Sequence, residues 1–330
     1  MKIDFHSHVI PPSFVAAVEN GPARLKARVL GSGSDRTVVH DQGYAYPLFS
    51  EFISVDAKIA AMDRKGIDIS VISPAPPTFT YWAERDLAIE VTRLVNDGVA
   101  EMVSARAERL RGMGILPIQN PDAAIAELER IVGMHGFRAV EIGTSIEGVK
   151  LTDERFAPVL RRAAELGVFI LAHPYYIGNK AGLEDYYLTN LIGNPLETTL
   201  MVADLMFSGT LDRLPDLKIG LAHGGGFTPY QIGRLVHGHK VRSETHANTV
   251  TSPLDLLRRF YFDSVVFEPQ ALAYLARLVG AERVFLGTDA PFDMGDEDPL
   301  KTLADAHGLT STERARIAGQ TALRLLGEAE

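Results

Sequence analysis

The sequence has 330 residues, a formal net charge of −9 and no cysteine. The missing thiols exclude disulfide bonds, thiolate metal ligands and a cysteine nucleophile. The negative charge disfavours a nucleic-acid surface, which needs clustered lysine and arginine. No apolar run is long enough to span a membrane, and the N-terminus lacks the pattern of a signal peptide. These features predict a soluble, cytoplasmic protein that binds neither nucleic acid nor membranes.

Short apolar runs rich in β-branched residues recur along the chain, and amphipathic stretches separate most of them. The predicted strands are residues 2–5, 69–72, 112–116, 139–142, 168–172, 218–222, 260–262 and 284–286. The clearest predicted helices are residues 55–65, 86–107, 121–134, 153–166, 195–207 and 269–278. Strands that alternate with helices form parallel βαβ units, and eight short apolar strands favour a closed barrel over an open sheet. We therefore expect one α/β domain over residues 1–330, a (β/α)₈ TIM barrel.

Two connections are longer than this pattern requires. Residues 10–54 follow the first strand and contain the turn-rich Gly31-Ser32-Gly33-Ser34, and residues 175–194 follow the fifth strand. Loops of this length in a compact domain are usually functional or disordered. Both insertions follow the carboxyl end of a strand, which is the end where barrel enzymes build their active sites.

Histidines and one aspartate occur at the ends of several predicted strands. His6 and His8 end the first strand, His173 closes the fifth, His223 closes the sixth, and Asp289 follows the eighth. Residues two apart in a strand point to the same side, so His6 and His8 can both bind one metal ion. By itself, His-x-His also fits a strand cap next to a surface histidine. The carboxyl ends of barrel strands converge, and nitrogen and oxygen donors without sulfur suit Zn²⁺, Mn²⁺ or Fe²⁺.

This set of strand-end residues resembles the amidohydrolase superfamily. The segments around these residues, and others along nearly the whole chain, resemble aminocarboxymuconate semialdehyde decarboxylases and their decarboxylase relatives. The segments that carry this resemblance are Met1-Lys2-Ile3-Asp4-Phe5-His6-Ser7-His8, Met62-Asp63-Arg64-Lys65-Gly66, Phe79-Thr80-Tyr81-Trp82-Ala83, Pro195-Leu196-Glu197-Thr198-Thr199 and the run from Ala222 through Gly226 to Arg234.

The resemblance implies a homodimer with one divalent metal ion per chain, Zn²⁺ as a rule and Mn²⁺ in some relatives. The implied metal ligands are His6, His8, His173 and Asp289. His223 would be the catalytic acid/base group beside the metal-bound water, with Asp289 as its catalytic partner. Strand four offers Glu141 and not the carboxylated lysine that bridges two metals in binuclear members, so we expect a single ion.

The implied activity is the non-oxidative decarboxylation of a small aromatic, heteroaromatic or muconate-like carboxylic acid. Loss of CO₂ leaves electron density on carbon, so a group with a pKa near neutrality must protonate that carbon. His223 suits this role. A hydrolase or hydratase on the same scaffold is the alternative: a metal-bound hydroxide would attack a carbonyl group, Asp289 would take its proton, and His223 would stabilise the oxyanion. A metal-binding barrel without catalytic activity is the third possibility.

Candidate substrate-binding residues follow from the resemblance and from the position of aromatic residues. Arg242 matches a family arginine that binds the substrate carboxylate, within its own chain or across the dimer, although an arginine that follows a helix is commonly solvated. The predicted pocket wall consists of Tyr46, Trp82 and Phe292, with Tyr44, Tyr175 and Tyr176 as further candidates. Aromatic residues on rim loops line pockets, but they also anchor the loops themselves.

The sequence differs from the pattern of aminocarboxymuconate semialdehyde decarboxylases at two substrate-binding positions. Residues 43–49 contain no counterpart of a second substrate-binding arginine, and an expected tryptophan is replaced around Asn190. Without that cation, a dicarboxylate would bind weakly. We therefore expect a different small carboxylate substrate, such as an aromatic monocarboxylate with an ortho hydroxyl group. His40, His135 and His307 are expected at the surface.

Overall fold

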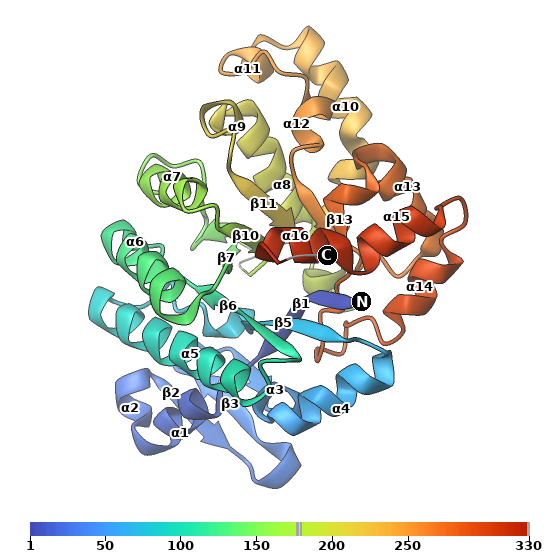
Figure 1. Ribbon diagram of the computed structural model, residues 1–330. Helices are drawn as coiled ribbons and strands as arrows, with labels where there is room; N and C mark the ends of the chain where they lie inside the picture. The colour runs from blue at the N-terminus through green and yellow to red at the C-terminus, as the bar shows by residue number, and fades with distance from the viewer. Residues whose placement is uncertain (176–177, 179, 329–330) are drawn as a thin grey trace.

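The computed structural model describes residues 1–175, 178 and 180–328, and these residues form an eight-stranded sheet surrounded by helices (Figure 1). The strands, in sheet order, are β1 (Ile3–Val9), β5 (Ile69–Pro74), β6 (Leu110–Ile115), β7 (Ala139–Gly143), β10 (Phe169–His173), β11 (Lys218–Leu221), β12 (Tyr261–Asp263) and β13 (Val284–Phe285). All neighbouring pairs are parallel. The sheet closes on itself, because Phe5 N donates to Leu286 O at 2.8 Å and Ser7 forms a parallel bridge with Ala290. The predicted α/β barrel is confirmed.

A helix follows each barrel strand. These helices are α4 (Val55–Lys65), α5 (Arg85–Ala105), α6 (Pro121–Arg130), α7 (Ala157–Glu165), α8 (Asn194–Phe207), α10 (Thr228–Val241), α13 (Pro269–Val279) and α14 (Pro299–Asp305). Six of these helices overlap the predicted ones, whereas α10 and α14 were not among the predicted helices. Local capping explains their bounds: Ser54 accepts a hydrogen bond from Ala57 N at the start of α4, and Gly66 ends it with a left-handed φ of 69°. The helix predicted over residues 121–134 is α-helical only to Arg130 and continues as a π-helical turn.

Shorter helices complete the described part of the chain. They are α1 (Pro12–Asn20), α2 (Pro22–Leu25), α3 (Ser50–Ile53), α9 (Thr210–Arg213), α11 (Ser243–His246), α12 (Pro253–Leu257), α15 (Ser311–Ala315) and α16 (Thr321–Leu326). Helix α16 crosses the end of the barrel next to the N-terminus (Figure 1). Its Leu323 and Leu326 belong to the same buried cluster as Phe5 and Phe169 inside the barrel, so this end of the barrel is closed by apolar packing. Among the described residues, no helix has both the length and the apolar character needed to cross a membrane.

The first insertion is folded and does not form a long loop. Within residues 10–54, β2 (Ala27–Leu30), β3 (Thr37–His40) and β4 (Ala45–Pro47) pair as an antiparallel sheet in that order. Alternating residues such as Val38 and His40 are buried, and this alternation is what stabilises a half-buried strand. Residues 10–54, described from the sequence as a long loop that is functional or disordered, are therefore not disordered, because their strands bury alternate side chains and pair with one another.

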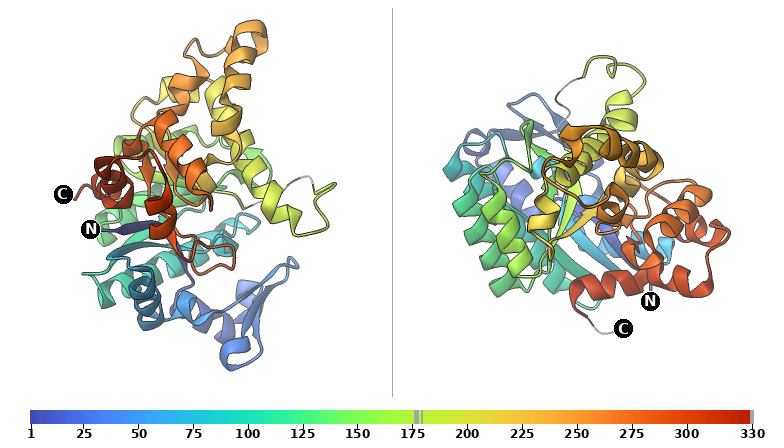
Figure 2. Two further views of the ribbon diagram at one scale, coloured as in Figure 1. Left: turned by 90° about the vertical axis from the view of Figure 1, so that its right-hand side faces the viewer. Right: turned by 90° about the horizontal axis from the view of Figure 1, so that it is seen from above.

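Both insertions lie at the same end of the barrel. In the left view of Figure 2, the antiparallel sheet (blue) and the segment that follows β10 (yellow-green) project from the side opposite to the two termini. This is the carboxyl end of the barrel strands, and the predicted positions of the two insertions, after strands one and five, are confirmed. The insertions therefore stand around the face on which the strand-end histidines lie.

Candidate metal centre

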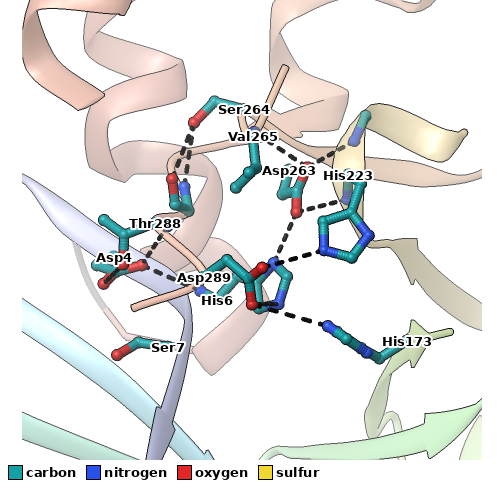
Figure 3. Close-up of polar contacts among 12 residues, drawn as sticks. Asp4, His6, Ser7, His173, His223, Asp263, Ser264, Val265, Thr288 and Asp289 are labelled. Carbon is teal, nitrogen blue, oxygen red and sulfur yellow. Dashed lines mark hydrogen bonds and ion pairs between the residues drawn. The ribbon is translucent and has the colours of Figure 1, made fainter. Parts of the chain in front are cut away.

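The five predicted strand-end side chains meet at the carboxyl end of the barrel. Figure 3 labels four of them: His6, His173, His223 and Asp289. Strand β1 runs to Val9, so His6 and His8 lie within it and point to the same side. His173 is the last residue of β10. His223 lies two positions beyond Leu221, the last residue of β11. Asp289 follows β13. Elements far apart in the sequence thus position five polar side chains around one point.

The distances between these side chains suit a single ion. His6 Nε2 and His8 Nε2 lie 3.1 Å apart. Asp289 Oδ1 lies 3.0 Å from His8 Nε2, 3.4 Å from His6 Nε2 and 3.8 Å from His173 Nε2. One donor atom from each of these four buried residues lies within 4.8 Å of all the others. Two ligands of one zinc ion are at most about 4.4 Å apart, so only a slight contraction would bring all four onto one ion.

The second nitrogen of each imidazole is held by its own partner. His6 Nδ1 donates to Asp263 Oδ2 at 2.6 Å, His8 Nδ1 donates to Ser73 Oγ at 3.2 Å, and His173 Nδ1 donates to Pro174 O at 2.9 Å. With a metal ion bound, Nδ1 would keep its proton and each Nε2 would present a lone pair to the ion, as metal-binding histidines do. In His6 the ion would take the place of the Nε2 proton. His173 Nε2 is buried and has no hydrogen-bond partner among the described residues. A buried acceptor without a hydrogen-bond partner is suited to bind a cation.

The electrostatics of the centre favour a positive charge. Burial lowers the pKa of His8 to about 3 and that of His173 to about 4, so both rings are neutral near neutral pH. Burial opposes ionisation of Asp289, but the surrounding imidazoles outweigh it and hold the pKa of Asp289 well below its usual value. Burial also disfavours charge on His6, yet the hydrogen bond to Asp263 and the charge of Asp289 raise the pKa of His6 to about 9. Two ionised carboxylates therefore create a place where a cation is stabilised.

Asp263 connects the centre to the loop of His223, and the sequence analysis missed it. It is the last residue of β12 and is fully buried. Besides holding His6, its carboxylate accepts hydrogen bonds from His223 N at 2.8 Å and Gly224 N at 2.7 Å. The predicted seventh strand ended one residue before Asp263. Applying the strand-end rule to this strand as well would have found it.

His223 and Asp289 both adopt a left-handed backbone conformation, with φ of 54° and 59°. This region is uncommon for residues other than glycine, and residues held there cluster at functional sites. Backbone hydrogen bonds hold both residues: His223 N donates to Asp263, and Asp289 N donates to His6 O at 2.9 Å. As a result, His223 Nε2 lies 3.3 Å from Asp289 Oδ2.

A cleft of about 1050 Å³ opens above this centre and reaches His173, His223 and Asp289. Its wall includes the expected aromatic residues Tyr46, Trp82 and Phe292, together with Tyr44 and Tyr175. The ring of Phe292 lies 5.2 Å from that of His8, edge to face. Tyr176, which was also expected in the wall, lies outside the described residues.

Arg242 does not line this cleft. It directly follows α10, its side chain is 65% exposed, and it forms an ion pair with Glu244 at 2.6 Å. Helix α10 has 14 residues, which corresponds to about 21 Å of length. Helix α10 starts at Thr228, shortly after His223, and Arg242 lies beyond its far end, between α10 and α11. Figure 1 shows these two helices in its upper part, away from the barrel strands.

The expectation that His40 lies at the surface was wrong. Its exposed fraction is 2%, its ring stacks on Tyr44 with a centroid distance of 4.3 Å, and its Nε2 lies 3.1 Å from Tyr46 Oη. Folding of the first insertion into a sheet is what buries it. Burial lowers the pKa of His40 to about 4, so His40 is a neutral support for the aromatic wall.

Comparisons with known proteins agree over most of the chain. The model of the amidohydrolase family matches residues 3–327. The 2-amino-3-carboxymuconate-6-semialdehyde decarboxylase of Dictyostelium discoideum is 32% identical over 330 residues, which cover 99% of this chain and 92% of that protein. The gamma-resorcylate decarboxylase of Rhizobium radiobacter is 30% identical over 292 residues, or 82% and 86% of the two chains. The crystal structure of Metarhizium anisopliae IDCase in apo form superposes with a TM-score of 0.85 and 27% identity, and covers 99% of this chain and 97% of that one.

Proposed function

We propose, from the premise that this chain belongs to the amidohydrolase family, that it is a metal-dependent non-oxidative decarboxylase of a small aromatic, heteroaromatic or muconate-like carboxylic acid. The observation that carries this function is the buried group of donor atoms from His6, His8, His173 and Asp289 at the base of an aromatic cleft. The two relatives named above are a 2-amino-3-carboxymuconate-6-semialdehyde decarboxylase and a gamma-resorcylate decarboxylase, which act on acids of this kind. We also propose that residues 1–330 act as one barrel domain.

One divalent ion would be held by these four residues, with Zn²⁺ as our first choice and Mn²⁺ as the alternative. Three imidazoles and a carboxylate suit either ion. Glu141 on β7 lies beside the centre, with its Oε2 3.6 Å from His8 Nδ1. Burial raises the pKa of Glu141 to about 8, so at neutral pH it adds no charge for a second ion. This supports a mononuclear centre.

The residues of the chain supply the proton. When bound, the metal acts as a Lewis acid and a template for the substrate carboxylate. Decarboxylation breaks the bond between the carboxyl group and a ring or vinyl carbon, whose electron pair stays on that carbon and must take a proton. The side chain of His223 is 17% exposed, more than those of His6, His8 and His173, and it faces the cleft. His223 therefore donates the proton, and Asp289 orients its ring.

The wall of the cleft selects a flat substrate. Tyr46, Trp82 and Phe292 offer neutral aromatic surface on which a ring can pack. Among the described residues that line the cleft, Lys180 is the sole lysine or arginine. One carboxylate would bind at the metal, while a second would find little positive charge among the lining residues. This supports the monocarboxylate expected from the missing arginine.

We propose that the protein is a homodimer and that Arg242 binds the substrate carboxylate of the partner's site. Leu196 and Leu200 on α8 and Tyr230 on α10 are exposed, and apolar residues grouped on the surface favour a protein contact. Because α10 leads away from its own centre, Arg242 can serve a substrate only in a second copy.

A complementation experiment tests the role of Arg242. The Arg242→Ala variant should have a KM raised about tenfold or more, since a bidentate charge-assisted contact is lost. Mixed dimers of Arg242→Ala and His223→Asn subunits contain one site with both residues intact, so at substrate concentrations below the native KM mixing should give more activity than the two parents together. Recovery of no more than the sum of the two parents would show that Arg242 does not act across the dimer.

Replacing Asp263 with asparagine should weaken metal binding about 10- to 100-fold, because His6 loses its anionic partner. A zinc titration of the stripped protein against a competing chelator measures this affinity. Asp296→Asn is the matched control: Asp296 is also a buried carboxylate, but it bonds to Asp298 N and Thr302. If the Asp263 variant bound zinc with native affinity, Asp263 would not be needed to hold His6 for metal binding.

The proposed activity is tested by measuring CO₂ release from the zinc- or manganese-loaded protein. The panel consists of hydroxy- and amino-substituted aromatic carboxylic acids, with 2-amino-3-carboxymuconate-6-semialdehyde as a reference. We expect CO₂ from at least one aromatic acid and slower turnover of the reference. If no member releases CO₂ while a lactone or amide is hydrolysed, the hydrolase alternative replaces the decarboxylase.

A further inference from the structure

Glu147 lies on the rim of the cleft, and its carboxylate has no hydrogen-bond or ion-pair partner among the described residues. Strand β7 is followed by a hairpin of β8 (Ser145–Ile146) and β9 (Val149–Lys150), and its two-residue turn is Glu147-Gly148. Glu147 lines the cleft. No hydrogen bond or ion pair of its carboxylate occurs within the described residues, and Lys180, the cation in the lining, does not pair with it.

The backbone of Glu147 is unusual for this residue type. Glu147 and Gly148 have φ of 50° and 79°, as in a type I′ turn, where asparagine, aspartate or glycine is normally preferred at the first position. The base of the hairpin is buried at Ser145 and Ile146, so the turn is fixed on the barrel. A glutamate held in a left-handed conformation beside a cleft points to a function for its side chain.

The surroundings of Glu147 are aromatic and neutral. Tyr44 and Tyr175 line the same cleft. Burial raises the pKa of Tyr44 to about 12, and the negative charge of Glu147 contributes to the increase. Burial, Tyr44 and Glu147, in that order, also raise the pKa of Tyr175. Trp82 Nε1 donates to Tyr44 Oη at 3.1 Å, and Tyr44 Oη donates to Pro77 O at 3.3 Å, so the hydroxyl of Tyr44 is already used and does not neutralise Glu147.

We propose that Glu147 determines specificity: its carboxylate accepts a hydrogen bond from a hydroxyl or amino group on the substrate, at the end away from the reacting carboxyl group, and disfavours a second carboxylate there. This inference rests on the proposed function for the placement of the reacting carboxyl group at the metal. Glu147 is exposed on the rim, and a substrate bound in the cleft would displace water from its carboxylate. A ligand that covers this acceptor without offering a donor would leave it unpaired, which disfavours that ligand. A second carboxylate would add like-charge repulsion.

The test uses a matched series of ligands on the zinc-loaded protein. The members are 2-hydroxybenzoate and its derivatives with a hydroxyl, amino or carboxylate group at position 4 or position 5. Dissociation constants come from calorimetry, and kcat and KM are measured for those members that release CO₂. We expect the best hydroxyl or amino derivative to bind about tenfold or more tightly than 2-hydroxybenzoate, and both dicarboxylates to bind about tenfold or more weakly.

In Glu147→Gln, the dissociation constants of the hydroxyl or amino derivative and of the dicarboxylates should differ from that of 2-hydroxybenzoate by less than about threefold. Glu154→Gln is the control, because Glu154 is exposed like Glu147 and lies close to it in sequence but does not line the cleft; it should behave as the native chain. The inference is overturned if Glu147→Gln keeps the native preferences, or if the native protein prefers a dicarboxylate. Because binding is measured separately from turnover, native preferences that vanish in Glu147→Gln, with no CO₂ release from this series or from the wider panel of acids, would support the role of Glu147 and refute the decarboxylase proposal.

Discussion

Replacing His223 with asparagine is expected to lower kcat by about 10²- to 10⁴-fold, the range in which general acid–base catalysis contributes, while leaving the metal content unchanged. His223 faces the cleft and lies 3.3 Å from Asp289 Oδ2, but it is not one of the four residues whose donor atoms surround a common point. Asparagine preserves polarity and approximate size but cannot deliver a proton. Steady-state CO₂ release and metal analysis of the same preparation measure the two effects separately.

His237→Asn is the matched control for this experiment. His237 lies exposed on α10 and does not line the cleft, so its replacement should leave kcat within about twofold of the native value. If the His223 variant kept native kcat, another group would have to protonate the product carbon. If it lost the metal together with activity, His223 would be a ligand and not the proton donor.

The His6→Ala/His8→Ala double variant is expected to contain less than a tenth of an ion per chain and to lose at least about 10³-fold in kcat/KM, because a Lewis acid contributes several kcal/mol of transition-state stabilisation. Both imidazoles are buried on β1 and present Nε2 to the centre. Elemental analysis, CO₂ release and far-ultraviolet circular dichroism are the measurements.

The barrel itself should persist in this variant, since its core is built by apolar residues such as Phe5 and Phe169 beneath the centre. His135→Ala/His307→Ala removes two histidines outside the centre and serves as the control, with native metal content expected. A double variant of His6 and His8 that stays folded, keeps one ion per chain and remains active would exclude the proposed ligand set.

Much of the centre was predictable because strand ends are strongly marked in this sequence. A barrel brings the carboxyl ends of its strands to one face, so His173 and Asp289 needed only correct strand assignments to be placed beside His6 and His8. The predicted strands overlapped all eight observed ones, since short β-branched runs between amphipathic helices leave few other arrangements.

The remaining features depend on tertiary contacts that local patterns do not encode. Asp263 looks like an ordinary strand-end residue until its contact with His6, 257 positions away in the sequence, is known. His40 became buried because residues 10–54 fold into a sheet. The position of Arg242 relative to the centre depends on how α10 packs against the barrel, which the sequence of the helix alone does not determine. The left-handed conformations of His223 and Asp289 oppose local preference and are held by distant hydrogen-bond partners.

The central claim is that four side chains from three separate parts of the chain bind one ion, and anomalous X-ray diffraction from crystals of the zinc-loaded protein tests it most directly. Data collected on both sides of the zinc absorption edge should show one strong peak per chain, about 2.0–2.2 Å from Nε2 of His6, His8 and His173 and from a carboxylate oxygen of Asp289. A peak located elsewhere, or the absence of a peak between these four residues at full zinc loading, would contradict the account.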